Sequence, residues 1–384
     1  MLEASELGLF FFGCFCALIQ IPLGLDGVGF GSWYELSTVA ANLAASGEFR
    51  DPFGVATGPT AHVAPVYTFI LALLIRIFRH AGTVIWAAII LNACLLGLAA
   101  ALLPKLSRRV YGRSEPGVAG GVLLALSGRL IPQWEVALSA LLLLVATQII
   151  LDGEAGAAGL FCGLSLLANP VSLPSLAILA SNRGKRFAVV ALAIALAVCL
   201  PWLVRNWIVL GGPFFVRDNL GVELFVSNHD KASADVVANE ALWTLHPNQN
   251  RQEAEMVASM GEGRYNRKRL RDGLCWIQAH PRRFLQLSAQ RAFYYWLPPR
   301  TEGWPAYSYW VLTILAVAGV WIGRRHRTAL LLAAAAVVYS LPFVIVHTID
   351  RHRFPSLWIS ALLAGYTVIT LLKHGRSILA GRPL

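Results

Sequence analysis

The sequence predicts an all-α integral membrane protein, and two observations lead to this fold class. The 384 residues are 57% hydrophobic and have a mean hydropathy of +0.59, which is well above that of ordinary soluble domains. Apolar runs of about 17–25 residues recur, which is the length that a helix needs to cross roughly 30 Å of hydrocarbon. We therefore expect a bundle of about ten transmembrane helices, near residues 7–25, 63–79, 82–103, 116–132, 134–151, 156–180, 187–207, 305–323, 328–347 and 355–373.

The first span is expected to remain as a transmembrane helix instead of being cleaved as a signal peptide. The leader before it carries Glu3 and Glu6 but no lysine or arginine. No small-x-small cleavage site follows the apolar run cleanly, so the pattern differs from that of a secretory signal.

A polar loop at 26–62 follows the first span and contains an amphipathic helix. Glu35, Thr38 and Asn42 share its polar side by the spacing of three and four residues. The other side is apolar and holds Trp33, Leu36, Val39, Ala40 and Leu43. We expect this helix to lie in the membrane interface and to end at Gly47.

The chain divides into three blocks. Residues 1–207 are expected to form an N-terminal transmembrane bundle that includes the exoplasmic loop 26–62. Residues 208–303 are the most polar block and read as a small, helical exoplasmic domain. Residues 304–384 return to the membrane as the C-terminal helices.

The polar block is expected to contain two long helices. The first covers Glu253 to Ala279, where glycines are the main helix breakers. The second begins at Pro281, a residue that suits the first helical turn. It ends in the aromatic cluster Tyr294-Tyr295-Trp296, which is typical of a membrane–water boundary.

The distribution of lysine and arginine predicts the orientation, because these residues favour the cytoplasmic side. With the N-terminus inside, four basic groups fall in the cytoplasm: Arg76 and Arg79; Arg183, Lys185 and Arg186; Arg324, Arg325 and Arg327; and Lys373, Arg376 and Arg382. A fifth group then lies outside, against this rule: Lys105, Arg108, Arg109 and Arg113. A missed or re-entrant segment near 104–133 would explain the exception.

Composition excludes several classes of function. The net charge of +11 suits contact with anionic lipid and phosphate, whereas the chain has no soluble basic domain for nucleic acid. Only Cys275 among the six cysteines lies in a polar region, which argues against a disulfide framework or a cysteine metal cluster. P-loop, HExxH, CxxC, GxSxG and dinucleotide patterns are absent from the sequence, which argues against ATP-driven pumps and nicotinamide enzymes. No pair of acidic residues forms an intramembrane ion relay, which weakens a transporter interpretation.

Glu35 is the candidate catalytic residue. Activation of an acceptor hydroxyl or amine requires a carboxylate within hydrogen-bond reach, and Glu35 projects from the polar face of the first-loop helix. The alternative is a solvated surface acid. Asp26, Glu48 and Asp51 are weaker candidates in the same loop.

Arg351 and Arg353 are the candidate phosphate ligands. They precede Pro355, which is placed as the first residue of the last span, so both arginines lie at a helix N-terminus that favours anions. A guanidinium also matches phosphate oxygens in a way that lysine does not. The alternative is interfacial snorkelling. Arg205, near the exit of the seventh span, is a third candidate with the same alternative.

Further polar residues are candidates to line a sugar site through hydrogen bonds to hydroxyl groups, although exposed polar residues usually indicate only solvation. They are Asp26, His62, Asn219, Glu223 and His229.

With these residues in place, the chain resembles membrane glycosyltransferases of the GT-C superfamily, in the group of dolichyl-phosphate-mannose-protein mannosyltransferases and aminoarabinose transferases. The resemblance depends on the order of several segments along most of the chain: Trp33-Tyr34-Glu35, Asp51-Pro52-Phe53, Thr57 to Tyr67, Pro201-Trp202, Arg205-Asn206, Asn219-Leu220-Gly221, Glu223-Leu224, His280-Pro281 and Arg351-His352-Arg353-Phe354-Pro355. Two features depart from the family pattern. The first-loop helix lacks the Asp-Glu pair of many members, and the chain has fewer C-terminal helices and no terminal soluble domain.

The resemblance implies an inverting transfer of a sugar from a polyprenyl-phosphate donor to a lipid, glycan or protein acceptor. Glu35 would be the general base, and the arginines would hold the donor phosphate as it leaves. The protein would be a multi-pass protein of the bacterial inner membrane with its active site on the periplasmic side. The sequence identifies no cofactor and leaves a divalent metal open. The competing interpretation is a non-catalytic protein that binds or translocates a polyprenyl lipid.

Overall fold

The computed structural model describes residues 3–19, 35–127, 134–212 and 215–379. Within these ranges the fold is all-α, as predicted, and the one β-contact is an isolated bridge between Arg50 and Pro59. The N-terminal helices are α1 (Ala4–Ile19), α2 (Glu35–Ser46), α3 (Pro65–Phe78), α4 (Ala81–Tyr111), α5 (Glu115–Ser127), α6 (Val136–Asp152), α7 (Ala155–Ala168), α8 (Leu173–Ser181) and α9 (Lys185–Leu210).

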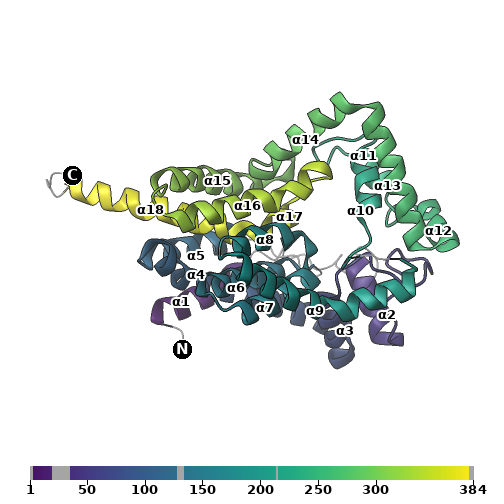
Figure 1. Ribbon diagram of the computed structural model, residues 1–384, viewed down its shortest axis with the longest axis horizontal. Coiled ribbons are helices and arrows are strands. Elements are labelled where there is room, and N and C mark those ends of the chain that lie inside the picture. The colour runs from purple at the N-terminus through teal and green to yellow at the C-terminus, as the bar shows by residue number, and fades with distance from the viewer. Residues whose placement is uncertain (1–2, 20–34, 128–133, 213–214, 380–384) are drawn as a thin grey trace.

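The polar middle block folds into a group of helices that we call the cap. They are α10 (Leu220–Ser227), α11 (Glu240–Leu245), α12 (Arg251–Met260), α13 (Glu262–Ala279) and α14 (Pro281–Trp296). The chain then returns to the bundle with α15 (Trp304–Ile322), α16 (Arg327–Ile345), α17 (Asp350–Arg353) and α18 (Leu357–Leu379). Figure 1 shows both termini toward one end of the bundle and the cap toward the other.

Four described helices are long and apolar enough to cross a membrane: Ala81–Tyr111, Lys185–Leu210, Arg327–Ile345 and Asp350–Gly375. Shorter apolar helices pack beside them, among them α1, α5, α6 and α7. Large apolar side chains remain exposed on the outside of this bundle, for example Val189, Val317 and Trp321. Exposure of such an apolar surface to water is unfavourable, whereas contact with the hydrocarbon chains of lipids is favourable. The chain is therefore a multi-pass membrane protein.

The expected span at 63–79 is not a membrane crossing. Its helix, α3, has only 14 residues, and Arg76 near its end donates a hydrogen bond to the backbone oxygen of Ala44 in α2 at 3.0 Å. The end of α3 therefore stays beside the first-loop helix. Arg79 follows in the left-handed conformation, with φ of 57°, and α4 begins at Ala81.

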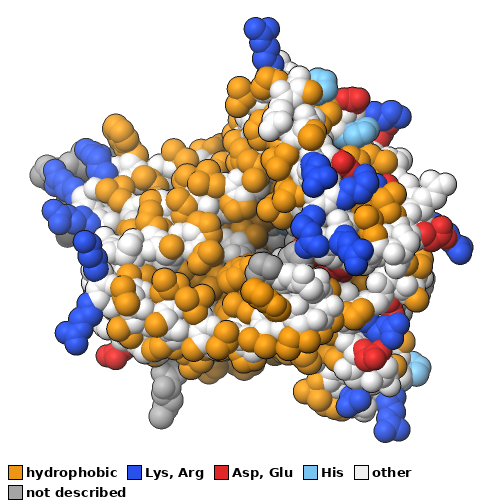
Figure 2. Space-filling model, turned by 45° about the vertical axis from the view of Figure 1, so that its right-hand side comes forward, with side chains coloured by type: hydrophobic (Ala, Val, Ile, Leu, Met, Phe, Trp, Pro, Cys, Tyr) orange, Lys and Arg blue, Asp and Glu red, His pale blue; other side chains and the backbone are white. Residues whose placement is uncertain are grey.

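This correction removes the exception to the positive-inside rule. Arg108, in the last turn of α4, forms ion pairs with Glu3 at 3.0 Å and Glu6 at 2.9 Å. The basic group at 105–113 therefore lies at the same end of the molecule as the N-terminus, and the prediction that it lies outside was wrong. Figure 2 shows lysine and arginine side chains gathered at that end.

The expected span at 156–180 is two helices. Pro170, which lacks a backbone N–H, follows Asn169, and a 3₁₀ turn separates α7 from α8. Close contacts of Gly159 with Ala191 and of Gly163 with Ala195 show that α7 and α9 run parallel. Because both helices run in the same direction, α8 returns the chain between them.

The cap helices follow the sequence pattern with one interruption. Gly261, with φ of 81°, separates α12 from α13, so the expected helix over Glu253 to Ala279 is broken there. Pro281 begins α14, and Trp296 ends it, as predicted. α13 packs on α10 so closely that a Cβ at Gly221 would meet the backbone oxygen of Asn266.

The first loop and the cap are joined by contacts that we call the seam, formed by Thr60 and Ala61 with Arg205, Asp218 and Glu262. Arg205 donates to the oxygen of Thr60 at 2.6 Å, and Asp218 N donates to the oxygen of Ala61 at 2.9 Å. The Glu262 carboxylate accepts from Ala61 N at 2.7 Å and from the Thr60 hydroxyl. The two polar loops therefore lie on the same side of the bundle, as the sequence predicted.

Candidate active site

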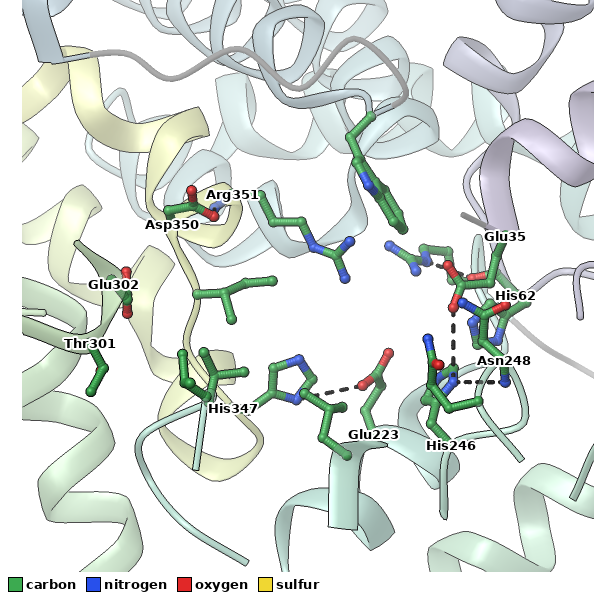
Figure 3. A pocket seen from close by; sticks show the side chains of 17 residues that line it. Glu35, His62, Glu223, His246, Asn248, Thr301, Glu302, His347, Asp350 and Arg351 are labelled. Carbon is green, nitrogen blue, oxygen red and sulfur yellow. Dashed lines mark hydrogen bonds and ion pairs between the residues drawn. The ribbon is translucent and has the colours of Figure 1, made fainter. Parts of the chain in front are cut away.

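Two adjoining cavities lie between the bundle and the cap. The first, of about 660 Å³, is polar at both ends, with Glu35 and His62 at one end and Thr301, Glu302 and Asp350 at the other (Figure 3). The second, of about 370 Å³, extends into the bundle and is mostly apolar. Five residues line both cavities and form what we call the junction: Trp134, Arg217, Glu223, His347 and Arg351.

Glu35, His62 and His246 converge on one wall of the first cavity. Glu35 is the first residue of α2 and is buried, with only 8% of its surface exposed. Its Oε1 lies 3.9 Å from Nδ1 of His246, which follows α11 in the cap. His62 lies in the segment before α3, and its ring contacts that of His246 edge to face at 5.7 Å. The fold thus brings together residues from two loops that are far apart in the sequence (Figure 3).

This wall could hold a divalent metal ion. Glu35, His62 and His246 each offer one ligand atom, and these atoms lie within 4.8 Å of one another. Two imidazoles and a carboxylate form a donor set used by catalytic zinc sites. Nδ1 of His62 is buried without a hydrogen-bond partner. Burial, assisted by His246 and Arg217, lowers the pKa of His62 well below its usual value, which leaves a neutral imidazole with a free lone pair.

Glu223 on α10 is the carboxylate at the junction. Burial raises its pKa, but His347, His246, His62 and Arg217 outweigh burial and bring the pKa down to about 2. Its Oε2 lies 3.6 Å from His347 Nδ1, whose own pKa burial lowers to about 4.

Arg351 and Arg217 are the cations at the junction. The guanidinium carbon of Arg351 lies 3.7 Å from the ring centroid of Trp134, which is a cation–π contact. Among the described residues, this guanidinium forms no hydrogen bond or ion pair, so its donors are available to a ligand. Arg217 donates to the oxygen of His62 at 2.9 Å and lies 3.9 Å from Glu135.

The other two predicted phosphate ligands lie outside both cavities. Arg353 is 2% exposed and donates to Glu302 at 2.6 and 2.9 Å and to the backbone oxygens of Tyr294 and Tyr295. Arg205 is engaged in the seam and stacks on Trp202. Their hydrogen-bonding capacity is used within the protein.

Of the candidate sugar-lining residues, some line the cavities and others do not. His62 and Glu223 line the first cavity, and Asn219 lines the second, where it donates to Glu223 at 3.1 Å. His229 packs against Phe225 and lines neither cavity. Asp26 lies outside the described residues.

The two weaker first-loop candidates are placed apart from the cavities. Glu48 is exposed and pairs with Arg50, whereas Asp51 accepts a hydrogen bond from Gly58 N in a turn. Glu35 is therefore the described acid of the first loop that faces the site.

Sequence reasoning missed three residues of the site as chemical candidates. Arg217 lies in the polar stretch after the seventh expected span and matches no motif, and His246 stands in the cap without ligand spacing to any other histidine. His347 precedes Asp350-Arg351 by a few residues, and this proximity was the available signal.

No protein-family model matches the sequence, and no curated protein matches it either. Solved structures of the oligosaccharyltransferase AglB from Archaeoglobus fulgidus share the fold. The complex with an inhibitory peptide and a dolichol-phosphate has a TM-score of 0.54 and 13% identity, covering 99% of this chain and 52% of that one. The apo form has a TM-score of 0.53 and 13% identity, covering 99% of this chain and 52% of that one. The complex with zinc and sulfate has a TM-score of 0.52 and 14% identity, covering 95% of this chain and 49% of that one.

The chain therefore shares the fold of these archaeal oligosaccharyltransferase structures, which is consistent with the resemblance described above. The chain spans about half the length of the archaeal structures that it matches. At this level of identity, the similarity establishes the fold and leaves the narrower families undistinguished.

Proposed function

We propose that this protein is a membrane glycosyltransferase that moves a sugar from a polyprenyl-phosphate donor to an acceptor. The observation that carries the proposal is the junction, where a cavity that extends into the bundle between apolar side chains meets a cavity that contains buried carboxylates, with Arg217 and Arg351 between them. A lipid-phosphate donor requires the first kind of surface, and activation of an acceptor requires the second. The archaeal fold relative was solved with a dolichol-phosphate and a peptide, which supports the same classes of donor and acceptor.

The donor would place its isoprenoid chain in the second cavity, whose walls include Val171, Leu173, Phe215 and Val346. Its phosphate would lie at the junction against Arg351 and Arg217. Guanidinium groups bind phosphate oxygens in paired, charge-assisted hydrogen bonds, and these bonds strengthen as negative charge develops on the leaving phosphate.

The acceptor would enter the first cavity, with Glu35 as the general base. Its hydroxyl or amine attacks the anomeric carbon of the sugar, the carbon–oxygen bond to the phosphate breaks, and the proton passes to the Glu35 carboxylate. Attack from the side opposite the phosphate inverts the anomeric configuration. His62, His246 and one oxygen of Glu35 would hold a divalent metal ion that supplies Lewis-acid assistance, and the second Glu35 oxygen would remain to take the proton.

The active site would open on the periplasmic side of a bacterial inner membrane. The basic groups that the sequence assigns to the cytoplasm, including Arg183, Arg186 and Arg324, support this orientation by the positive-inside rule.

The direct test is transfer by the purified protein from defined polyprenyl-phosphate sugars, with the products detected by mass spectrometry. The proposal expects a product that requires both donor and acceptor and that disappears in Glu35→Gln. Glu48→Gln is the matched control, because this exposed acid lies in the same loop but outside both cavities. Saturable donor binding without transfer to any acceptor class would favour the non-catalytic lipid-binding alternative.

A further inference from the structure

The outward face of α13 carries a stripe of four basic residues that the proposed reaction does not use. Arg264, Arg267, Lys268 and Arg271 are all exposed and recur at i, i+3, i+4 and i+7. This spacing aligns their side chains along one face of the helix, over roughly 10 Å. We call it the basic stripe. The opposite face, with Tyr265, Asn266, Arg269 and Gly273, is buried against the rest of the cap.

Acidic residues offset part of this charge, because Arg267 interacts electrostatically with Asp218 and Lys268 pairs with Asp272. Of the two acids in α13, Glu262 is buried in the seam, and Asp272 pairs with Lys268 and with the inward-facing Arg269 at 2.9 Å each. Arg264 and Arg271 form no hydrogen bond or ion pair within the described part of the chain. The stripe therefore presents a local excess of positive charge, which favours an anionic partner.

The first residues of the basic stripe lie near exposed apolar side chains at the end of α9 and the start of α10. The seam connects the first residue of α13 to Arg205, near the end of α9. Just beyond Arg205, α9 exposes Trp207 by 60% and Ile208 by 74%. Leu220, 55% exposed, precedes the Gly221 that packs under α13. Figure 2 shows lysine and arginine side chains over the cap with apolar surface close by.

We propose that the basic stripe binds the phosphate headgroups of anionic phospholipids in the leaflet nearest the cap. The exposed tryptophan and isoleucine of α9 suit the hydrocarbon edge, and the arginines of α13 lie next to that edge, at the level of the headgroups. Such basic residues attract an anionic membrane surface. A soluble polyanion would gain nothing from the adjoining apolar side chains, and for this reason the observations favour lipid. The inference depends on membrane insertion and is independent of the proposed transfer reaction.

Cys275 provides a native probe for this inference. It lies one turn beyond Arg271 on α13 and is the exposed one among the six cysteines, all of which fall in described ranges. A fluorophore attached to Cys275, in full-length protein in lipid nanodiscs, reports quenching by headgroup-spin-labelled phospholipids. The measurement compares an anionic quencher lipid, phosphatidylglycerol, with a zwitterionic one, phosphatidylcholine, at equal mole fraction.

The anionic lipid should quench the wild-type label several-fold more strongly than the zwitterionic lipid, and about 0.5 M salt should reduce this preference. Replacement of all four stripe residues by glutamine should abolish it. Arg264→Gln and Arg271→Gln, which remove no internal contact, should each reduce it if the fourfold variant is unstable. The charge-matched control replaces four other exposed basic residues of the same region by glutamine, and it should retain the preference: Lys231, Arg251, Arg282 and Arg300.

Three results would overturn the inference. The first is equal quenching by both lipids in the wild type, and the second is an equal loss in the control, which would indicate net charge instead of position. The third is stripe-dependent binding of soluble polyphosphate in detergent without any response to lipid charge, which would assign the stripe to a soluble polyanion.

Discussion

The junction and the seam contain the same types of buried residue, acids and arginines, but the hydrogen bonds of these residues differ. In the seam, Glu262 and Arg205 are bonded to the backbone and hydroxyl of the first loop. At the junction, the Arg351 guanidinium contacts the ring of Trp134 and forms no hydrogen bond among the described residues, and Glu223 Oε2 lies 3.6 Å from His347 Nδ1 without a hydrogen bond to a described residue. The comparison teaches that burial of a charge does not by itself mark an active site. The marker is bonding capacity that the protein leaves unused and directs into a cavity.

Glu35 should show the largest effect of any single residue. Glu35→Gln keeps the shape of the side chain and removes the proton acceptor, so the transfer rate should fall by roughly 10²–10⁴-fold. Folding should be unchanged, as judged by thermal unfolding in detergent. Near-normal turnover of Glu35→Gln would assign the base to another acid, with Glu223 the next to test.

Arg351 and Arg353 test the comparison directly, because they are two residues apart and only one faces the cavities. Arg351→Ala should weaken binding of a polyprenyl phosphate by about tenfold to a hundredfold, since charge-assisted bonds contribute roughly 1.5–3 kcal/mol each. Arg351→Lys should restore part of the affinity. Equilibrium binding to correctly folded protein measures both.

Arg353→Ala should instead lower stability, because it leaves buried Glu302 without its cation, at a cost of about 3–5 kcal/mol. The surviving folded fraction should bind donor normally. Equal losses of donor affinity in Arg351→Ala and Arg353→Ala would contradict the distinction between them.

The wall of Glu35, His62 and His246 predicts one divalent ion per chain. His246→Ala should reduce the metal content of protein equilibrated with zinc at least about tenfold, because removal of a ligand should cost no less than loss of an outer-shell partner. Elemental analysis measures this without any activity. His229→Ala is the control, since this histidine lies outside both cavities; equal metal content in His229→Ala and His246→Ala would refute the site.

The seam should show the smallest effect, as a pH dependence. Burial raises the pKa of Glu262 to about 8 and that of Asp218 to about 7, above their usual values of 4.5 and 3.8. Raised pKa values mean that the seam is most stable below about pH 4 and loses stability as the pH rises from there to about 7–8, the folded-state pKa values, above which the loss levels off. Hydrogen exchange of residues 57–63, corrected for intrinsic rates, should therefore accelerate by up to about tenfold per pH unit.

Glu262→Gln is the matched variant for the seam. The amide retains the size of the side chain and an oxygen that accepts from Ala61 N, but it does not ionise. It should flatten the pH dependence, and an unchanged slope would show that Glu262 does not control the seam.

Local patterns in the sequence predicted most of the helices well. Gly47 and Pro281 mark helix ends through backbone conformation, and apolar length identifies α9 and α16 as candidate spans. The errors at 63–79 and 156–180 have one cause. An apolar run shows that a segment is buried, but its direction depends on neighbours such as Ala44 for α3 and α9 for α7.

The sequence by itself determined that this is an all-α membrane protein, because hydrophobic length and helix-ending residues act within one segment of chain. It also drew attention to Glu35 and to Arg351. Only the tertiary structure decided that His62 and His246 lie beside Glu35 and that Arg353 forms an ion pair with Glu302. The reason is physical: the availability of a charged group depends on the partners that packing brings to it, and those partners are distant in the chain.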